Sequence, residues 1–172
     1  MVSRGLGDVY KRQLPTSTQY SRNSLFSGLL PLEIQKKFPE FWRNDSDEGG
    51  KNMYEELFLR KLVDEKFHHD IKLSYNKITN IDFGRKFVNQ INNLSNNELN
   101  VIVYNFVDML SHARTDMKVI KELAEDDYAY RSLTLSWFEH SPLREILRKI
   151  SDQGAKLIIT TDHGTINVEK PI

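Results

Sequence analysis

The chain has 172 residues, of which 39% are hydrophobic and 10% aromatic, enough apolar material for the core of one globular domain. Its 24 basic and 24 acidic side chains cancel, so bulk charge does not draw the chain to nucleic acid or to an anionic membrane. Because there is no cysteine, the chain has neither a disulfide nor a thiolate metal site, and a metal would need carboxylate and imidazole ligands. That ligand set favours zinc, manganese or a similar ion.

No segment of the sequence predicts a membrane span. The apolar runs at residues 101–107 and 157–159 are far shorter than the roughly 20 residues that cross a bilayer. No signal peptide is visible in the first residues. We therefore expect a soluble, cytoplasmic protein with no membrane partner.

The first residues differ in character from the rest of the chain. Residues 3–13 read SRGLGDVYKRQ, which resembles the in-frame translation of a transposon-type sequencing adapter. We predict that residues 1–13 are a non-native leader and that residues 14–172 are a partial domain, cut at both ends. Such a fragment is expected to be inactive by itself.

In the first half of the chain, the spacing of apolar residues predicts helices over 21–29, 32–38, 52–67 and 83–94. The polar run 44–51 reads as a surface loop, and a strand is expected within 68–79. Residues 99–106 form the clearest strand, since valine and isoleucine run almost unbroken there, as is typical of a strand covered on both faces.

The second half predicts three helical segments and another strand. The helices are expected over 117–125, 128–139 and 143–153, the last one ending at Gly154. A second buried strand is expected over 156–161. Strands that alternate with helices predict an α/β fold, here a mostly parallel sheet flanked by helices on both faces and incomplete at both ends.

In such a fold the working site lies beyond the carboxyl ends of the strands, and Asp108 and Asp162 each follow a predicted strand. Asp108 and His112 are four residues apart, a spacing that lets a carboxylate and an imidazole converge if the chain between them turns helically. Taken alone, a capping aspartate beside a surface histidine explains this pair more readily.

The second strand end is followed by a denser motif. Asp162 and His163 are adjacent residues of metal-ligand type, and Gly164 lets the backbone bend sharply beside them. A simple turn built on aspartate and glycine explains this motif equally well when it stands alone.

Near the start, hydroxyl residues precede the first predicted helix. Residues 15–18 read PTST, and a hydroxyl at a helix amino terminus lies where the dipole and the backbone N–H groups favour an anion such as phosphate. Helix capping is the commoner role of any one such residue, so the three motifs must be judged together.

Together the motifs resemble the alkaline phosphatase superfamily and, within it, the PglZ domain. The PTST run, followed by Phe26, Ser27, Gly28 and Pro31, is similar to the nucleophile segment of that superfamily. The Asp-x-x-x-His and Asp-His pairs are similar to its two metal-binding motifs. The likeness is close to the effector domain of PorX-like response regulators, which serve type IX secretion, and is carried by LPTSTQYSRNSLFSGL, NFVDMLSHARTDM, LTLSWFEHSPLREIL and LIITTDHGT.

The resemblance implies a metal-dependent phosphohydrolase of the phosphodiesterase type. Thr18 would be the nucleophile, and two divalent metal ions, zinc in this interpretation, would be held by Asp108, His112, Asp162 and His163 together with Thr18. The superfamily pattern has one more carboxylate upstream and one more histidine downstream, and neither is matched here. The implied substrates are phosphodiesters, including short or cyclic oligonucleotides.

Two further residues are candidates for substrate binding. His140 precedes a predicted helix start, and Arg22 lies near the proposed nucleophile in the sequence, so both could contact a phosphate. An ordinary hydrogen-bonded histidine and a solvated arginine are the commoner outcomes for such residues.

The resemblance also implies a receiver domain upstream in the parent chain. The alternative to an enzyme is a docking module that binds a partner such as a sigma factor or a secretion regulator and keeps a structural metal site. Thr18 discriminates between the two, because a structural metal site does not need a nucleophile. An α/β domain of unrelated function would bind no metal at all.

Overall fold

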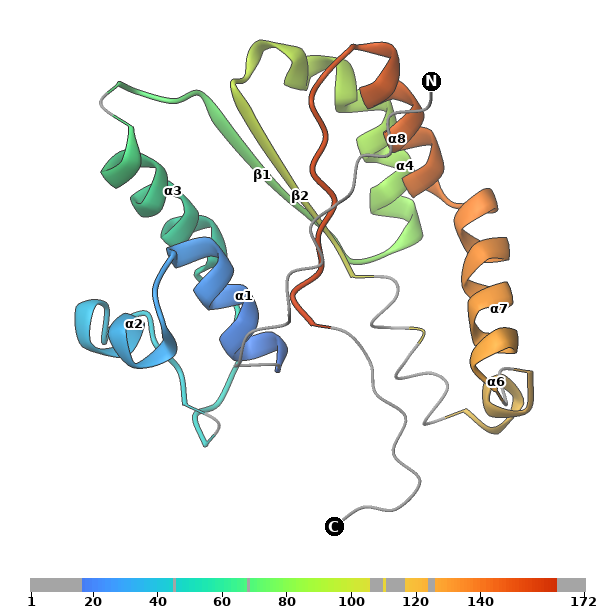
Figure 1. Ribbon diagram of the computed structural model, residues 1–172, viewed down its shortest axis with the longest axis horizontal. Helices are drawn as coiled ribbons and strands as arrows, with labels where there is room; N and C mark the ends of the chain where they lie inside the picture. Colours follow the sequence, from blue (N-terminus) through green and yellow to red (C-terminus); the bar gives the residue numbers. More distant parts are fainter. Residues whose placement is uncertain are drawn as a thin grey trace, which may run out of the picture. The chain divides into compact units, whose positions relative to one another are not determined.

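The computed structural model describes residues 17–44, 46–67, 69–105, 110, 117–123 and 126–163. Figure 1 shows the helices and strands of these residues, and the chain divides into two compact units, of which only the described residues are discussed below. Unit 1 is made of Met1–His69 and Ile159–Ile172, and unit 2 is made of Asp70–Ile158.

Unit 1 contains three helices, α1 (Thr18–Ser27), α2 (Pro31–Lys37) and α3 (Glu55–Lys66). Helix α1 ends at Gly28, whose left-handed backbone (φ 67°) is a conformation that glycine adopts without strain. Helix α2 begins with Pro31, and the Glu33 carboxylate accepts a hydrogen bond from the Leu30 N–H at 2.7 Å. The end of α1 and the start of α2 therefore lie where the local sequence provides the signal.

The core of unit 1 lies among these three helices. Ile34 and Phe58 are 0% and 1% exposed, and the rings of Phe38 and Phe58 are 5.8 Å apart. A Cβ atom on Gly28 would lie 2.9 Å from a methyl group of Leu62 on α3. Glycine at this position therefore permits the end of α1 to approach α3 closely.

Unit 2 contains a strand–helix–strand arrangement. Strand β1 (Leu73–Ile78) pairs in parallel with β2 (Leu99–Tyr104), from Leu73 opposite Leu99 to Ile78 opposite Tyr104. The connection runs through α4 (Ile81–Gln90) and the 3-10 helix η1 (Ile91–Asn96), because parallel strands cannot be joined by a tight turn. Asn80 caps α4 by accepting a hydrogen bond from the Phe83 N–H at 2.8 Å.

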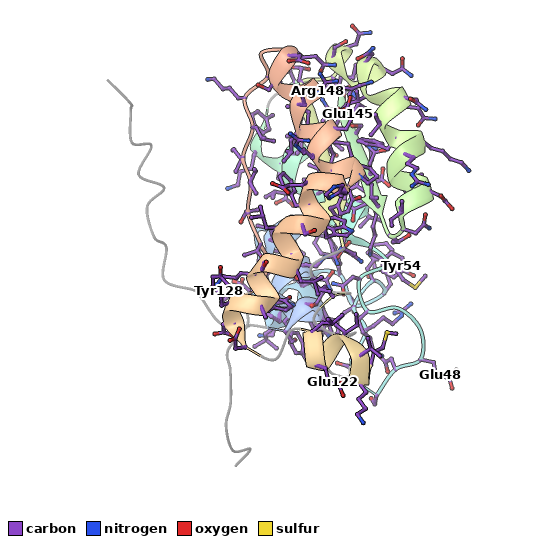
Figure 2. All side chains as sticks on the ribbon, turned by 90° about the vertical axis from the view of Figure 1, so that its right-hand side faces the viewer. Glu48, Tyr54, Glu122, Tyr128, Glu145 and Arg148 are labelled. Carbon is purple, nitrogen blue, oxygen red and sulfur yellow. The ribbon has the colours of Figure 1, made fainter. Side chains whose placement is uncertain are left out.

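The remaining described helices of unit 2 are α6 (Lys118–Leu123), α7 (Asp127–His140) and α8 (Pro142–Asp152). The core joins the sheet to α4 and α8, and its buried members are Ile78, Phe87, Ile91 and Ile146. Helix α7 buries none of its residues, and Tyr128 in its first turn is 78% exposed (Figure 2). Packing in unit 2 is therefore concentrated on α8 rather than on α7.

The predicted helices and the first two predicted strands are present within the described residues, and the α/β class and parallel pairing are confirmed. Strand β2 is half-buried, with Asn100 exposed, rather than covered on both faces as expected. The described core packs against the sheet face that carries Ile78, Ile102 and Tyr104, and helices on both faces stay a prediction. No helix in the described ranges has the length and hydrophobicity to span a membrane.

The prediction of a buried strand over residues 156–161 is wrong. The segment has no strand pairing and is exposed along its length, with Ile158 and Ile159 at 89% and 74%. Branched apolar residues favour a strand, but a strand also needs a free edge to pair with, and composition does not supply one. Asp162 therefore follows an unpaired extended segment and not the end of a buried strand.

Candidate active site

Thr18 is the first residue of α1, so the helix begins at the proposed nucleophile rather than three residues later as expected. The preceding residue, Ser17, has an extended backbone (φ −84°, ψ 146°), and its side chain makes no capping hydrogen bond. The first backbone N–H groups of a helix have no partner within the helix and attract anions. Thr18 thus lies at a helix end whose dipole favours phosphate.

The side chain of Thr18 meets the Asp-His motif. Its Oγ1 atom and Nε2 of His163 are hydrogen-bonded at 2.6 Å, although the two residues are 145 positions apart in the sequence. Both belong to unit 1. The structure therefore brings together two of the three motifs that the sequence analysis singled out independently.

The turn around His163 is held by its own neighbours. The Asp162 carboxylate accepts a hydrogen bond from the His163 N–H at 3.0 Å, and Thr161 donates its hydroxyl to the His163 carbonyl at 2.6 Å. The side chains of Asp162 and His163 are 21% and 25% exposed. They are ordered by local contacts and still accessible to a solute.

The donor atoms at this place fit a divalent metal in kind. A hydroxyl oxygen, an imidazole nitrogen and a carboxylate oxygen come together, since Nε2 of His163 is 2.6 Å from Thr18 Oγ1 and 3.8 Å from Asp162 Oδ2. Zinc accepts nitrogen and oxygen ligands at about 2.0 to 2.1 Å, so two such ligands around a tetrahedral ion are about 3.3 Å apart. The two separations, 2.6 and 3.8 Å, lie on either side of that value.

The other half of the predicted ligand set, Asp108 and His112, lies outside the described residues. Within the part of the chain that the structure describes, no group of three or more histidine, aspartate and glutamate side chains could hold a metal ion. The roles predicted for Asp108 and His112, and the second metal that they imply, stay predictions.

Arg22, a predicted substrate-binding residue, is placed inside unit 1. Its Nη2 atom donates to Oε2 of Glu55 at 2.7 Å, and the two side chains are 10% and 1% exposed. The alternative interpretation, a solvated arginine, is therefore wrong, because the guanidinium lies in a buried ion pair. Its contact with Glu55 ties α1 to the first residue of α3 and gives Arg22 a structural task whatever else it binds.

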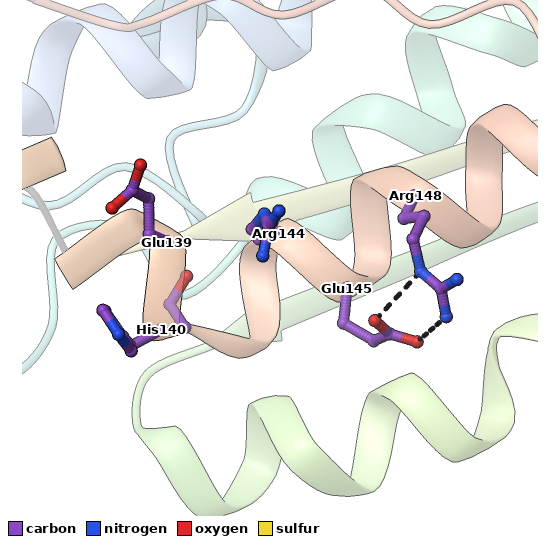
Figure 3. Close-up of a pocket in the computed structure, with 6 residues that line it drawn as sticks. Glu139, His140, Arg144, Glu145 and Arg148 are labelled. Carbon is purple, nitrogen blue, oxygen red and sulfur yellow. Dashed lines mark hydrogen bonds and ion pairs between the residues drawn. The ribbon is translucent and has the colours of Figure 1, made fainter. Parts of the chain in front are cut away.

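His140, the other predicted substrate-binding residue, belongs to unit 2. It is exposed, and its Nδ1–H donates to the Ser136 carbonyl of its own helix at 2.8 Å. It lies at a pocket of about 360 Å³ between the end of α7 and the start of α8 (Figure 3). The lining residues are Glu139, His140, Ser141, Arg144, Glu145 and Arg148.

Two of the residues that line this pocket, Glu145 and Arg148, form an ion pair. Arg148 donates to the Glu145 carboxylate through two nitrogens, at 2.8 and 3.2 Å (Figure 3). The hydrogen bond from Arg148 lowers the pKa of Glu145, and the same bond raises the pKa of Arg148. Both groups are therefore charged at neutral pH, and the part that His140 plays stays a prediction.

Two residues near Thr18 were missed by sequence reasoning. Asn52 donates its side-chain amide to the carbonyls of Thr18 and Gln19, and nothing in its sequence context marks it. The position of Glu55 could have been predicted from the sequence, because it lies at helical spacing on the same face of α3 as Phe58 and the other buried residues. An acidic residue on a buried stripe indicates a buried partner of opposite charge.

The parallel strand pair of unit 2 is an α/β arrangement, which is consistent with an alkaline phosphatase-like domain. The matching family model is described as the BREX system PglZ alkaline phosphatase-like domain, and it covers residues 7–172. The chain therefore belongs to the PglZ family. None of the curated proteins compared with the chain matches it. Alkaline phosphatase-like proteins usually bind divalent metal ions, which agrees with the chemistry of the donor atoms beside Thr18.

Proposed function

We propose that the chain is a metal-dependent phosphohydrolase domain of the phosphodiesterase type with Thr18 as its nucleophile. The observation that supports this most is the 2.6 Å contact between Thr18 Oγ1 and His163 Nε2 in a chain of the PglZ family. A hydroxyl at a helix amino terminus, beside an imidazole and a carboxylate, is a suitable arrangement for attack on a phosphate.

The proposed metal ligands on the described residues are Asp162 and His163, with Thr18 within reach. Asp108 and His112 complete the proposed set, and we propose zinc as the ion. When bound, divalent ions would stabilise the negative charge on the nucleophile and on the leaving oxygen.

The chain's own residues would carry the covalent chemistry in two steps. The Thr18 hydroxyl gives its proton to solvent water and Oγ1 bonds to phosphorus, while the bond to the leaving oxygen breaks and that oxygen takes a proton from solvent water, so that the step neither gains nor loses a proton overall. The resulting phosphothreonine is then hydrolysed by a second water, which restores the hydroxyl and releases the phosphomonoester. The backbone N–H groups at the start of α1 would orient the phosphate oxygens throughout.

Replacing the nucleophile tests this proposal. The protein, with any flanking sequence that its gene encodes, is loaded with zinc and given bis-para-nitrophenyl phosphate. We expect Thr18→Ala to reduce kcat at least about 1,000-fold, because nucleophilic attack is removed while binding remains. Thr18→Ser keeps the hydroxyl and should retain measurable turnover. Equal turnover in Thr18→Ala and wild type would exclude Thr18 as nucleophile.

We further propose that this domain is a cytoplasmic effector of a response regulator, with a receiver domain upstream and short or cyclic oligonucleotides among its substrates. Support for this comes from the sequence likeness to PorX-like proteins. If zinc binds tightly but no diester is hydrolysed, a docking module for a partner such as a sigma factor becomes the better account.

A further inference from the structure

The turn that carries Thr18 is not capped by its own sequence. Ser17 makes no side-chain hydrogen bond to the first turn of α1. A catalytic group must be held closely, since a displacement of about 1 Å can cost about 100-fold in rate. Contacts from outside α1 must therefore hold this turn if Thr18 is to attack efficiently.

Asn52 supplies one such contact. Its Nδ2 atom donates to the backbone carbonyls of Thr18 and Gln19, at 3.3 and 3.4 Å. The Gln19 side chain in turn donates to the Arg43 carbonyl at 2.8 Å. These bonds reach the main chain of the turn, so they restrain the position of the Thr18 Cα atom and not only a side chain.

Glu55 supplies the second contact, one helical turn further along α1. It accepts the hydrogen bond from Arg22 at 2.7 Å, and its side chain is almost fully buried. Arg22 follows Thr18 by four residues, so the two side chains project from the same face of α1. A charge-assisted bond at a site with little water is strong, and it fixes that face of α1 against the start of α3.

We propose that Asn52 and Glu55 are positioning residues for the Thr18 nucleophile. Asn52 fixes the backbone of its turn, and Glu55 acts through Arg22 on the helix face from which the hydroxyl projects. This inference rests on the proposed role of Thr18, and it adds the residues that orient the Thr18 hydroxyl. A contact that serves stability alone would change the Tm and leave the kcat of the folded enzyme as it was.

The test compares variants of the zinc-loaded protein on bis-para-nitrophenyl phosphate. We expect Asn52→Ala and Glu55→Gln each to lower kcat roughly 10- to 100-fold while KM stays within about two-fold. The reason is that the Thr18 hydroxyl loses its orientation, whereas the substrate still binds in the ground state. The matched control is Glu56→Gln. Glu56 is the next residue in the same turn and pairs with Arg60 at 2.7 Å, but on the surface, so its loss should leave kcat unchanged.

A second measurement does not depend on catalysis. The amides of Tyr20 and Ser21 bond to the Ser17 carbonyl at 3.1 and 2.9 Å, and their hydrogen exchange reports on the Thr18 turn. We expect exchange at both amides to be several-fold faster in Asn52→Ala and unchanged in Glu56→Gln. Asn52 is only half-buried, so this variant can decide the question even if Glu55→Gln fails to fold.

The outcomes separate the two proposals. If wild type shows Thr18-dependent hydrolysis and both variants keep its kcat, the positioning role is overturned and the proposed function stands. If kcat falls only in proportion to a loss of folded protein, the contacts are structural and the inference is equally overturned. If wild type shows no Thr18-dependent hydrolysis, the proposed function fails, and the inference fails with it.

Discussion

Tyr104, the last residue of β2, carries a hydroxyl in an unfavourable place. The oxygen is buried and, among the described residues, has no hydrogen-bond partner, while the ring packs edge-on against Trp137 at 5.9 Å. A buried polar atom without a partner costs about 1 to 3 kcal/mol. The ring of Tyr104 therefore stabilises unit 2, whereas its hydroxyl destabilises it.

Removing that oxygen should therefore stabilise the protein. We expect Tyr104→Phe to raise the free energy of unfolding by about 1 kcal/mol, measured by urea titration near neutral pH. Trp137→Phe is a useful comparison, since it disturbs the same ring contact from the other side and should destabilise. A Tyr104→Phe variant less stable than wild type would mean that the hydroxyl has a favourable partner.

The same residue predicts a pH effect. Burial raises the pKa of Tyr104, so the folded protein keeps this proton at a pH where the unfolded chain releases it. Stability should therefore fall as pH rises past about 10, the ordinary pKa of tyrosine. Because Tyr104→Phe lacks this loss, the stability gap between variant and wild type should widen from about pH 8 to about pH 10.5. A stability difference between Tyr104→Phe and wild type that does not change with pH would contradict a raised pKa for Tyr104.

At the scale of elements, the contact between α4 and α8 depends on Gly84. Glycine within a helix usually costs about 1 kcal/mol relative to alanine. Here a Cβ atom would lie 3.1 Å from both the Pro142 ring and the Tyr104 hydroxyl. The first turn of α8 occupies the space that an alanine methyl would need.

We expect Gly84→Ala to destabilise the protein by about 1 kcal/mol in spite of its better helix propensity, because overpacking outweighs that gain. Ser132→Ala, at an exposed position of α7, provides the matched gain in propensity without a clash and should be neutral or slightly stabilising. In a Tyr104→Phe background the destabilisation by Gly84→Ala should be smaller, since the Tyr104 hydroxyl oxygen is then absent from the space next to the alanine methyl. Additive effects in the urea titrations would argue against this contact.

Local sequence signals predicted elements better than they predicted partners. The helix ends predicted at Gly28 and Gly154 agree with the structure, because each depends on residues close in sequence. For the same reason the strand predicted over residues 99–106 is present as β2, Leu99–Tyr104. The strand expected at 156–161 failed because pairing depends on a distant edge. The meeting of Thr18 with His163 could not be derived from spacing at all, and only the family resemblance suggested it.

At the scale of the whole molecule, the chain passes from unit 2 back to unit 1 between Ile158 and Ile159. The passage lies in the exposed extended segment that follows α8, where the side chains of Leu157, Ile158 and Ile159 are 48%, 89% and 74% exposed. Backbone without helix or strand pairing and with exposed side chains is readily accessible to a protease.

In limited proteolysis, this exposed segment should therefore be among the first sites to be cut. We expect trypsin to cut after Lys156 before it cuts after Lys149, which lies in α8 and donates its ammonium group to the Val88 carbonyl at 3.1 Å. Mass spectrometry of the first fragments gives the order of the cuts. Protection of Lys156 would show that the segment is covered in solution.

The hydrogen bond between Thr18 and His163 also has a consequence for synthesis. Translation adds about 5 to 20 residues per second, so roughly 7 to 30 s separate the two residues on the ribosome. Helices α1, α2 and α3 can pack on one another during this interval, before His163 has been synthesised and Thr18 can form this hydrogen bond. The three helices of unit 1 can therefore form before the contact between Thr18 and His163, which closes only when the last part of unit 1 has been made.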